Sequence, residues 1–350
     1  MSDAPPKASI ADRRAAADQY DFRGLHPHVR FGTASDRYAG WIGQIYPEEM
    51  YRNRLSSRTR TLKGDTFKEQ QVPIESVKTY FNHFDILELD FTFYRPLLNE
   101  GERTSNYHVL SKYLEYAPDD ASFLIKAPQQ FFARTVRRRG SFVDNPDFLD
   151  GPEYIRTFHE PAVDLLGDQL EGLIFQQEYQ RVKSSPAPEE NIDQLDRFFT
   201  QVPDDVQTHI ELRSEHLLTS AYFDWLEERE LGYVFSHWTW LPAIREQWDL
   251  CGQRFTAGND QVVARLLTPR NMKYADAYAA AHPFDAPVAD LSETEQAHDM
   301  VLDATALAYQ AEAHGALLNL IANNRAWGNA PDLSRTIALR ILEEEERRST

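Results

Sequence analysis

Hydrophobic and polar residues along this chain fall into short apolar runs bounded by turn-forming residues, with longer stretches of helical periodicity between them. From the apolar runs we predict eight β-strands, at residues 29–35, 85–90, 122–127, 172–177, 208–213, 232–237, 261–267 and 317–324. The helical stretches cover residues 104–116, 155–166, 189–200, 219–229, 293–314 and 333–345. A strand followed by a helix, repeated around a sheet, is typical of the (β/α)8 barrel, so we predict an α/β fold consisting of a single TIM barrel.

The barrel is expected to occupy residues 29–350 as one domain, because no internal repeat or low-complexity linker divides this segment. Insertions at residues 36–80 and 268–292 enlarge its first and last strand–helix units. Residues 1–28 lack the apolar segment of a signal peptide and are expected to form a flexible or partly helical extension. An open or doubly wound sheet is the alternative, because the segment after residues 232–237 is short and interrupted by a proline.

Charged side chains stand at the ends of the predicted strands, on the face that should point into the barrel. In residues 85–90, Glu88 and Asp90 alternate with leucines, which places both carboxylates on one face. Polar residues at the ends of the other strands are Lys126, Gln176, Glu211, Arg213, His237, Arg265 and Asn323. Active sites of TIM barrels lie at the C-terminal ends of the strands, and buried charges are costly unless they pair or serve chemistry. The pattern therefore predicts one polar pocket. The alternative is a network of ion pairs that fills the barrel without a catalytic role.

In this pocket we predict catalytic roles for Glu88, Glu211 and Lys126, with one of the glutamates as general acid or base. Arg213 and Arg265, together with Lys126, would bind a carboxylate or phosphate group. The rest of the predicted substrate-binding set includes Asp90, Gln176, His237, Asn323 and, from the first insertion, Trp41. A deeper residue on the face of Glu211, His209, is interpreted as a core histidine with satisfied hydrogen bonds.

No cofactor is expected, because the chain lacks motifs for a phosphate-binding loop, a dinucleotide site, a zinc protease and a calcium loop. A divalent metal could be bound by Glu88, Asp90, Glu211 and His237. The neighbouring cations already neutralise these carboxylates, so we expect no metal.

Composition narrows the classes of partner. The net charge of −18 and the isoelectric point of about 5.0 disfavour nucleic acids and anionic membranes. Cationic residues nevertheless concentrate at residues 51–63 and 134–140, either as solvated loops or as a rim that attracts anions. No apolar stretch is long enough to span a membrane, and the single Cys251 excludes an intramolecular disulfide. We therefore expect a soluble, cytoplasmic protein.

Several motifs resemble those of the domain-of-unknown-function-72 (YecE-like) family. They are, in chain order, FGTAS, GWIGQIYP, ELDFTFYRP, FLIKAP, GLIFQQ, IELRSEHLL, ARLL and NLIANN. The resemblance implies a TIM barrel with a polar pocket at its C-terminal face, but no particular reaction. It adds Tyr94 to the substrate-binding set, and it implies site positions at Thr33, Trp41, Glu88, Thr92, Lys126, Gln176, Glu211, Arg213, Arg265 and Asn323. The sequence departs from the family pattern at Asp36, Asp90, Ser214 and Leu267, which leaves a shared histidine-based mechanism in doubt.

Three functions remain open at this point. The first is an enzyme that acts on a small anionic or polyhydroxylated substrate by carboxylate acid/base chemistry. The second is binding or processing of nucleic acid in a barrel like that of the apurinic endonucleases. The third is a barrel that binds a ligand without catalysis, and fold alone does not choose among the three. The reaction and the oligomeric state are not specified by the sequence.

Overall fold

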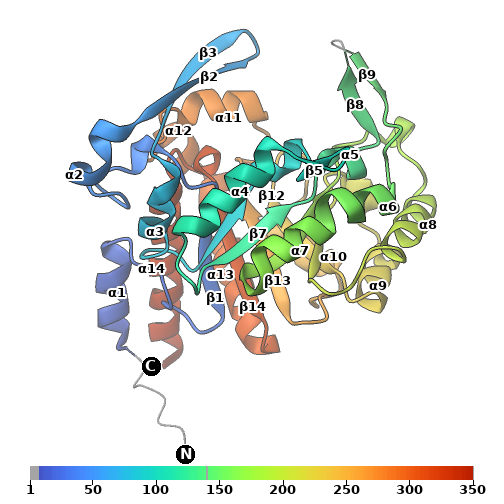
Figure 1. The fold of residues 1–350 in the computed structure, drawn as a ribbon. Helices are drawn as coiled ribbons and strands as arrows, with labels where there is room; N and C mark the ends of the chain where they lie inside the picture. Colours follow the sequence, from blue (N-terminus) through green and yellow to red (C-terminus); the bar gives the residue numbers. More distant parts are fainter. Residues whose placement is uncertain (1–7, 139–140, 350) are drawn as a thin grey trace, which may run out of the picture.

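The computed structural model describes residues 8–138 and 141–349. In this part of the chain, eight parallel strands close into a barrel in the order β1-β14-β13-β12-β11-β10-β7-β4, and β4 pairs with β1 (Figure 1). The strands are β1 (Val29–Ala34), β4 (Ile86–Leu89), β7 (Ser122–Lys126), β10 (Leu170–Gln176), β11 (Thr208–Glu211), β12 (Gly232–His237), β13 (Gln261–Leu266) and β14 (Leu317–Ala322). Every predicted strand is present. The predicted TIM barrel is confirmed, and the open-sheet alternative is wrong.

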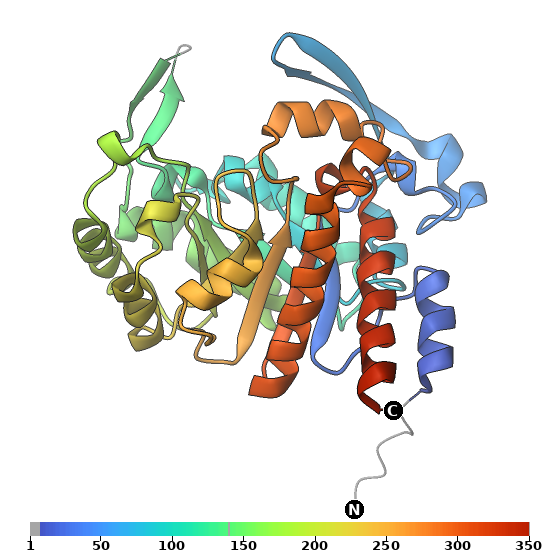
Figure 2. The ribbon, with the colours of Figure 1, turned by 180° about the vertical axis from the view of Figure 1, so that it is seen from behind.

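Helices cover the outside of the barrel (Figures 1 and 2). The longer ones are α4 (Ser105–Tyr116), α7 (Glu160–Leu166), α8 (Pro188–Phe199), α9 (Ser220–Glu228), α10 (Ile244–Leu250), α11 (Tyr274–Ala281), α13 (Glu295–His314) and α14 (Ala330–Ser349). Single helical turns are α2 (Glu48–Tyr51), α3 (Val77–Tyr80), α5 (Gln129–Phe132), α6 (Gly151–Tyr154) and α12 (Ala289–Ser292). In α8, Leu195, Phe198 and Phe199 recur at helical spacing and are buried, so one face of the helix packs on the core.

The residues before β1 also form structure. Helix α1 (Ile10–Asp18) begins at Ser9, whose side chain accepts a hydrogen bond from the Asp12 N–H at 3.1 Å. It lies beside α14 in both views (Figures 1 and 2), where Arg13 donates hydrogen bonds of 2.9 and 2.6 Å to Glu345. Phe22 follows the helix and is fully buried. The extension was predicted for residues 1–28, of which residues 1–7 lie outside the described residues. Residues 10–28 contact the rest of the structure through a helix and a buried aromatic ring.

Two β-hairpins project from the C-terminal end of the barrel (Figure 1). The first insertion forms one from β2 (Ser56–Leu62) and β3 (Asp65–Gln71), and β8 (Thr135–Arg138) with β9 (Ser141–Asp144) forms the other. A third, short pair is β5 (Leu98–Asn99) with β6 (Glu102–Arg103). The last insertion forms α11 and α12, and α11 lies close to the first hairpin (Figure 2). The enlarged first and last units thus meet over the same end of the barrel.

The interior of the barrel is filled in layers. One cluster of aliphatic side chains crosses its middle, formed by Ala34, Ile86, Leu124, Ile174, Val234, Val263 and Ile321. His209 lies at this level, because its strand pairs it with Ile174 on one side and with Gly232 on the other. Towards the C-terminal ends, the next inward-facing positions carry Glu88, Lys126, Glu211 and Arg265. The apolar layer therefore seals the charged layer from the N-terminal end.

Candidate functional site

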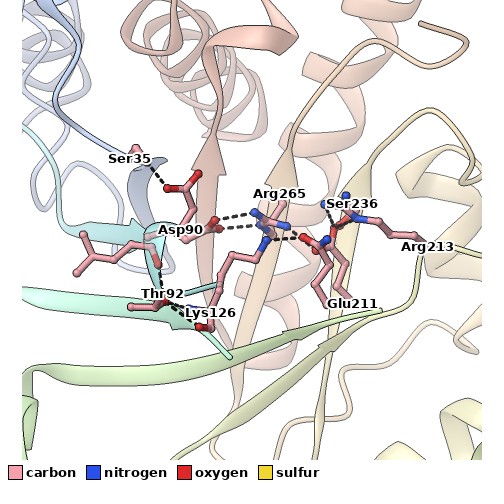
Figure 3. A network of polar contacts seen from close by, with 11 residues as sticks. Ser35, Asp90, Thr92, Lys126, Glu211, Arg213, Ser236 and Arg265 are labelled. Carbon is pink, nitrogen blue, oxygen red and sulfur yellow. Dashed lines mark hydrogen bonds and ion pairs between the residues drawn. The ribbon is translucent and has the colours of Figure 1, made fainter. Parts of the chain in front are cut away.

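Arg265 of β13 holds two glutamates from other strands. Its Nε and Nη2 donate to the two carboxylate oxygens of Glu88 at 2.7 and 2.6 Å, and its Nη1 donates to Glu211 Oε2 at 2.5 Å. None of the three side chains is more than 3% exposed. Figure 3 shows Arg265 at the centre of this arrangement. Bidentate pairing of this kind fixes orientation as well as charge, so the three residues act as one rigid unit that spans the barrel.

Glu211 has further donors on its other side. Ser236 Oγ donates to its Oε1 at 2.8 Å, and Arg213 Nη2 lies 3.3 Å from the same oxygen (Figure 3). Burial alone would raise the pKa of Glu211, but Arg213 and Arg265 outweigh it and hold the pKa at about 2. Arg213 is in turn stacked on the Trp238 ring, 4.2 Å from its centroid. Glu211 is therefore a permanently ionised anchor at neutral pH.

Lys126 of β7 is the titratable cation of the group. Its Nζ donates to Gln176 Oε1 and lies 4.2 Å from the centroid of the Phe93 ring. Thr92 Oγ1 donates to the Lys126 carbonyl at 2.8 Å and fixes the end of the strand (Figure 3). Burial, reinforced by the positive charge of Arg265, lowers the pKa of Lys126 to about 7. A buried amine with this pKa can gain or lose a proton near neutrality.

A cavity of about 510 Å³ opens beside this network, at the C-terminal ends of β1, β4 and β14. Three of the predicted residues line it: Asp90, Tyr94 and Asn323. Strand β4 ends at Leu89, and Asp90 starts the 3₁₀ turn that follows, where its Oδ1 accepts a hydrogen bond of 2.7 Å from Ser35 (Figure 3). The predicted pocket thus has two parts. Asp90 belongs to an open cavity, whereas Glu88, Lys126, Glu211 and Arg265 form a buried layer next to it.

Sequence reasoning missed several residues that line the cavity. Arg58 and Arg60 reach it from β2, where Arg58 pairs with Glu69 and Arg60 donates to the Tyr274 hydroxyl at 2.6 Å. Both arginines belong to the cationic stretch at residues 51–63 that the sequence revealed. The sequence did not show that this stretch reaches the cavity.

Arg325, from the turn after β14, also lines the cavity and lies 4.5 Å from the centroid of the Tyr274 ring. Within residues 8–138 and 141–349, no carboxylate forms an ion pair with Arg325, and its buried Nε has no hydrogen-bond partner. The only signal in the sequence was its place directly after Asn323 and Asn324.

Five predicted substrate-binding residues do not line the cavity. Arg265 belongs to the buried layer and Gln176 and Arg213 contact it, whereas Trp41 and His237 lie apart from both. Trp41 is fully buried and donates its Nε1–H to Asn324 Oδ1 at 3.1 Å, so it supports the turn rather than lining the space. His237 is 1% exposed, and its Nδ1 lies 2.8 Å from the Thr268 carbonyl oxygen. Burial lowers the pKa of His237 to about 4, which leaves the ring neutral.

The second cationic stretch, residues 134–140, is also remote. Arg134 donates to Asn191 at 2.9 Å and is not among the residues that line the cavity. Residues 139 and 140 lie outside the described residues.

In the part of the chain that the structure describes, no group of three or more His, Cys, Asp or Glu side chains is arranged to hold a metal ion. Nor does any described helix combine the length and apolarity needed to cross a membrane.

Comparisons with known proteins agree with this architecture. Residues 57–348 match a family described as "Protein of unknown function DUF72". A crystal structure of a DUF72 family protein from Thermotoga maritima MSB8 is 16% identical, with a TM-score of 0.52, and the match covers 91% of this chain and 99% of that one. A DUF72 family protein from Enterococcus faecalis V583 is 13% identical, with a TM-score of 0.56 and coverage of 90% and 95%. No curated protein matches this chain. At these identities, the structural likeness concerns the fold alone.

Proposed function

This chain belongs to the DUF72 family of proteins of unknown function, and on that premise we propose that it is an enzyme acting on a small anionic or polyhydroxylated substrate at the C-terminal mouth of its barrel. The observation that carries this proposal is Arg325. A guanidinium that lines a cavity and lacks a carboxylate partner offers its donors to an incoming anion, and its planar fork suits a carboxylate or a phosphate. Asp90 and Asn323 in the same cavity add acceptors and donors for hydroxyl groups.

The buried layer beside the cavity has a supporting role in this proposal. Glu88 and Glu211 are both engaged by Arg265, so we assign them to fixing that cation rather than to transferring protons. Lys126 keeps the role of an acid or base, because its pKa of about 7 suits proton transfer at neutral pH. It lies on β7, directly beside β4, whose end carries Asp90. This assignment revises the predicted division of labour among the three catalytic candidates.

Nucleic acid is the second candidate ligand, supported by Arg58 and Arg60 of the projecting hairpin, which line the same cavity. A nucleic-acid strand would engage several cations at once, so its affinity would fall steeply with salt. Against it stands the net charge of −18. A small anion held mainly by Arg325 would show a much shallower dependence on salt.

Thermal unfolding with added ligands tests the proposal. We would compare wild type, Arg325→Gln and Lys126→Met with the matched controls Arg181→Gln and Lys183→Met, whose parent side chains are exposed and outside the cavity. The panel contains sugar phosphates, hydroxycarboxylic acids, short oligonucleotides and divalent metal ions. A ligand at a hundredfold excess over its Kd stabilises the folded state by about 2.7 kcal/mol, which raises the melting temperature measurably.

We expect a small anion to stabilise the wild type and both controls, and the effect to be lost in Arg325→Gln. Stabilisation by oligonucleotides alone, with a steep salt dependence, would favour the nucleic-acid candidate instead. If no compound stabilises the wild type, or if Arg325→Gln responds like the wild type, the proposed substrate site is wrong. Turnover of a bound compound, lost in Lys126→Met, separates an enzyme from a barrel that only binds.

A further inference from the structure

Asp36 is a second carboxyl in the wall of the cavity that holds Arg325. It follows β1, is 1% exposed and lines the cavity together with Asp90. The backbone turns sharply just before it, because Ser35 adopts a φ of +69°, a conformation that side-chain-bearing residues rarely take. Strain of this kind persists only where surrounding contacts hold it, and here the Ser35 hydroxyl is tied to Asp90. The turn brings the two aspartates to one cavity.

The hydrogen bonds of Asp36 are incomplete. The Tyr113 hydroxyl donates to its Oδ1 at 2.7 Å, and the Tyr46 hydroxyl donates to its main-chain oxygen at 2.9 Å. Its Oδ2 is buried and has no hydrogen-bond partner among the described residues. An unsatisfied carboxylate oxygen in a buried site costs free energy, and a donor from a ligand would remove that cost. Unlike Glu88 and Glu211, Asp36 forms no ion pair with an arginine side chain in the described part of the chain.

The surroundings leave the charge of Asp36 adjustable. Burial raises the pKa of Asp36 to about 6, against the opposing effects of the Tyr113 hydrogen bond and of Arg37. The charged and titratable groups around it are Arg37, Asp90, Tyr46, Tyr80 and Tyr113. Burial raises the pKa values of the three tyrosines above their ordinary value, so they stay neutral, and Asp90 is the one acidic neighbour among these groups.

We infer that Asp36 is the proton-exchanging carboxyl of this cavity and that its substrate is a hydroxylated acid, such as a sugar acid. This inference rests on the proposed function, because Arg325 would hold the anionic group of the substrate. A substrate hydroxyl then lies against Asp36 Oδ2. Its O–H bond breaks, the proton forms an O–H bond on Oδ2, and the electron pair remains on the substrate oxygen. Asp90 accepts a hydrogen bond from a second hydroxyl.

A matched pair of ligands tests the roles of Arg325 and Asp36 separately. Gluconate and hexanoate are carboxylates of equal chain length, and only gluconate carries hydroxyl groups. We would measure the melting temperatures of wild type, Asp36→Asn and Arg325→Gln with each ligand at about pH 5 and about pH 7.5, on either side of the Asp36 transition. The wild type should be stabilised more by gluconate than by hexanoate. This excess should be larger at the higher pH, where ionised Asp36 accepts a charge-assisted hydrogen bond.

The variants then distinguish the outcomes. Asp36→Asn should keep the hexanoate effect and lose the pH-dependent excess of gluconate, whereas Arg325→Gln should lose both effects. An unchanged excess in Asp36→Asn overturns the role of Asp36 and leaves the anion site intact. If Arg325→Gln keeps both effects, the proposed function itself is overturned.

Chemical labelling tests Asp36 without any substrate. A water-soluble carbodiimide activates protonated carboxyls, and a small amine then converts the activated carboxyl into an amide. We expect the native protein to be labelled at Asp36 near pH 6, as read by peptide mass spectrometry, and phosphate bound at Arg325 to slow that labelling. Labelling of Asp36 only after unfolding would show that no ligand reaches it and would overturn the inference, whatever the ligand panel shows.

Discussion

The core position predicted for His209 is confirmed, but the hydrogen bonds predicted for its ring are not found in the described part of the chain. It is fully buried in the barrel, as a core histidine should be, but neither ring nitrogen has a hydrogen-bond partner among the described residues. Glycines on the adjacent strands make room for it. A Cβ atom at Gly232 would lie 2.1 Å from its Nδ1, and one at Gly172 would lie 3.2 Å from its Cδ2. The ring is therefore accommodated by shape and not by hydrogen bonds.

This environment predicts a pH effect on stability. Burial lowers the pKa of His209 to about 3, from an ordinary value of 6.5. Between these values the unfolded chain binds one more proton than the folded one, so the free energy of unfolding falls as the pH drops through this window. Urea denaturation at about pH 7 and about pH 5 should show that His209→Leu loses roughly 1–2 kcal/mol less stability than the wild type over this interval. The exposed His298→Leu serves as the control, and equal losses in both variants would contradict the effect.

The hairpin of β2 and β3 is held over the cavity by contacts with α11. Glu69 lies at the centre of these contacts: it is 6% exposed, it accepts a hydrogen bond from Tyr278, and it pairs with Arg58. Near the tip, Lys63 forms an ion pair of 2.6 Å with Asp276. Most other side chains of the hairpin are exposed or partly exposed, but Leu62 and Phe67 pack against the small buried cluster that includes Tyr278, so polar contacts and a limited apolar contact together fix its position.

We predict that Glu69→Gln loosens this hairpin without unfolding the barrel. Removing the charge weakens the pairing with Arg58, which both leaves residues 56–71 more open and frees a cation at the cavity. Amide hydrogen exchange should accelerate in residues 56–71 only, while the melting temperature changes little. Asp65→Asn, an exposed change on the same hairpin, should leave exchange as in the wild type. A large fall in melting temperature would show instead that the hairpin is part of the cooperative core.

Across the whole molecule, the features that could be predicted from the sequence are those that follow from the regular spacing of side chains in strands and helices. Strand alternation alone placed Glu88, Glu211 and Arg265 on the inner face, because inward and outward positions are fixed within a strand. Asp36 and Arg325 lie just beyond strand ends, where the backbone leaves the regular pattern, and no spacing rule indicates which way they turn. The cavity needs the first insertion, β14 and α11 together, so it is a product of tertiary structure. Sequence therefore found the buried layer and three residues of the cavity wall, Asp90, Tyr94 and Asn323, but it did not find Asp36 and Arg325.

The buried layer itself links distant parts of the barrel, and it determines the last prediction. Arg265 joins β4 and β11 across the interior, so Arg265→Met leaves Glu88 and Glu211 as two close carboxylates with no opposing guanidinium between them. Removing one partner of a buried pair typically costs about 3–5 kcal/mol, because a charge remains without compensation. Chemical denaturation should show a loss of this size, because Glu88 loses its guanidinium partner while Glu211 keeps Arg213.

The triple variant Arg265→Met, Glu88→Gln and Glu211→Gln removes Arg265 and its two carboxylates together, although Arg213 and Lys126 keep their charges, and it should recover part of the stability lost in Arg265→Met. Recovery to near the wild-type value, with loss of ligand binding, would mean that the network is retained for the site rather than for folding, as expected when replacing buried ions by neutral groups is close to neutral. A triple variant no more stable than Arg265→Met would mean that the ion pairs hold the barrel closed. The alternative reading of this layer, a network that fills the barrel without a catalytic role, would then be favoured. In both cases, comparing the free energies of unfolding of the two variants distinguishes the destabilisation caused by an unpaired buried charge from the net stabilisation that the ion pairs contribute.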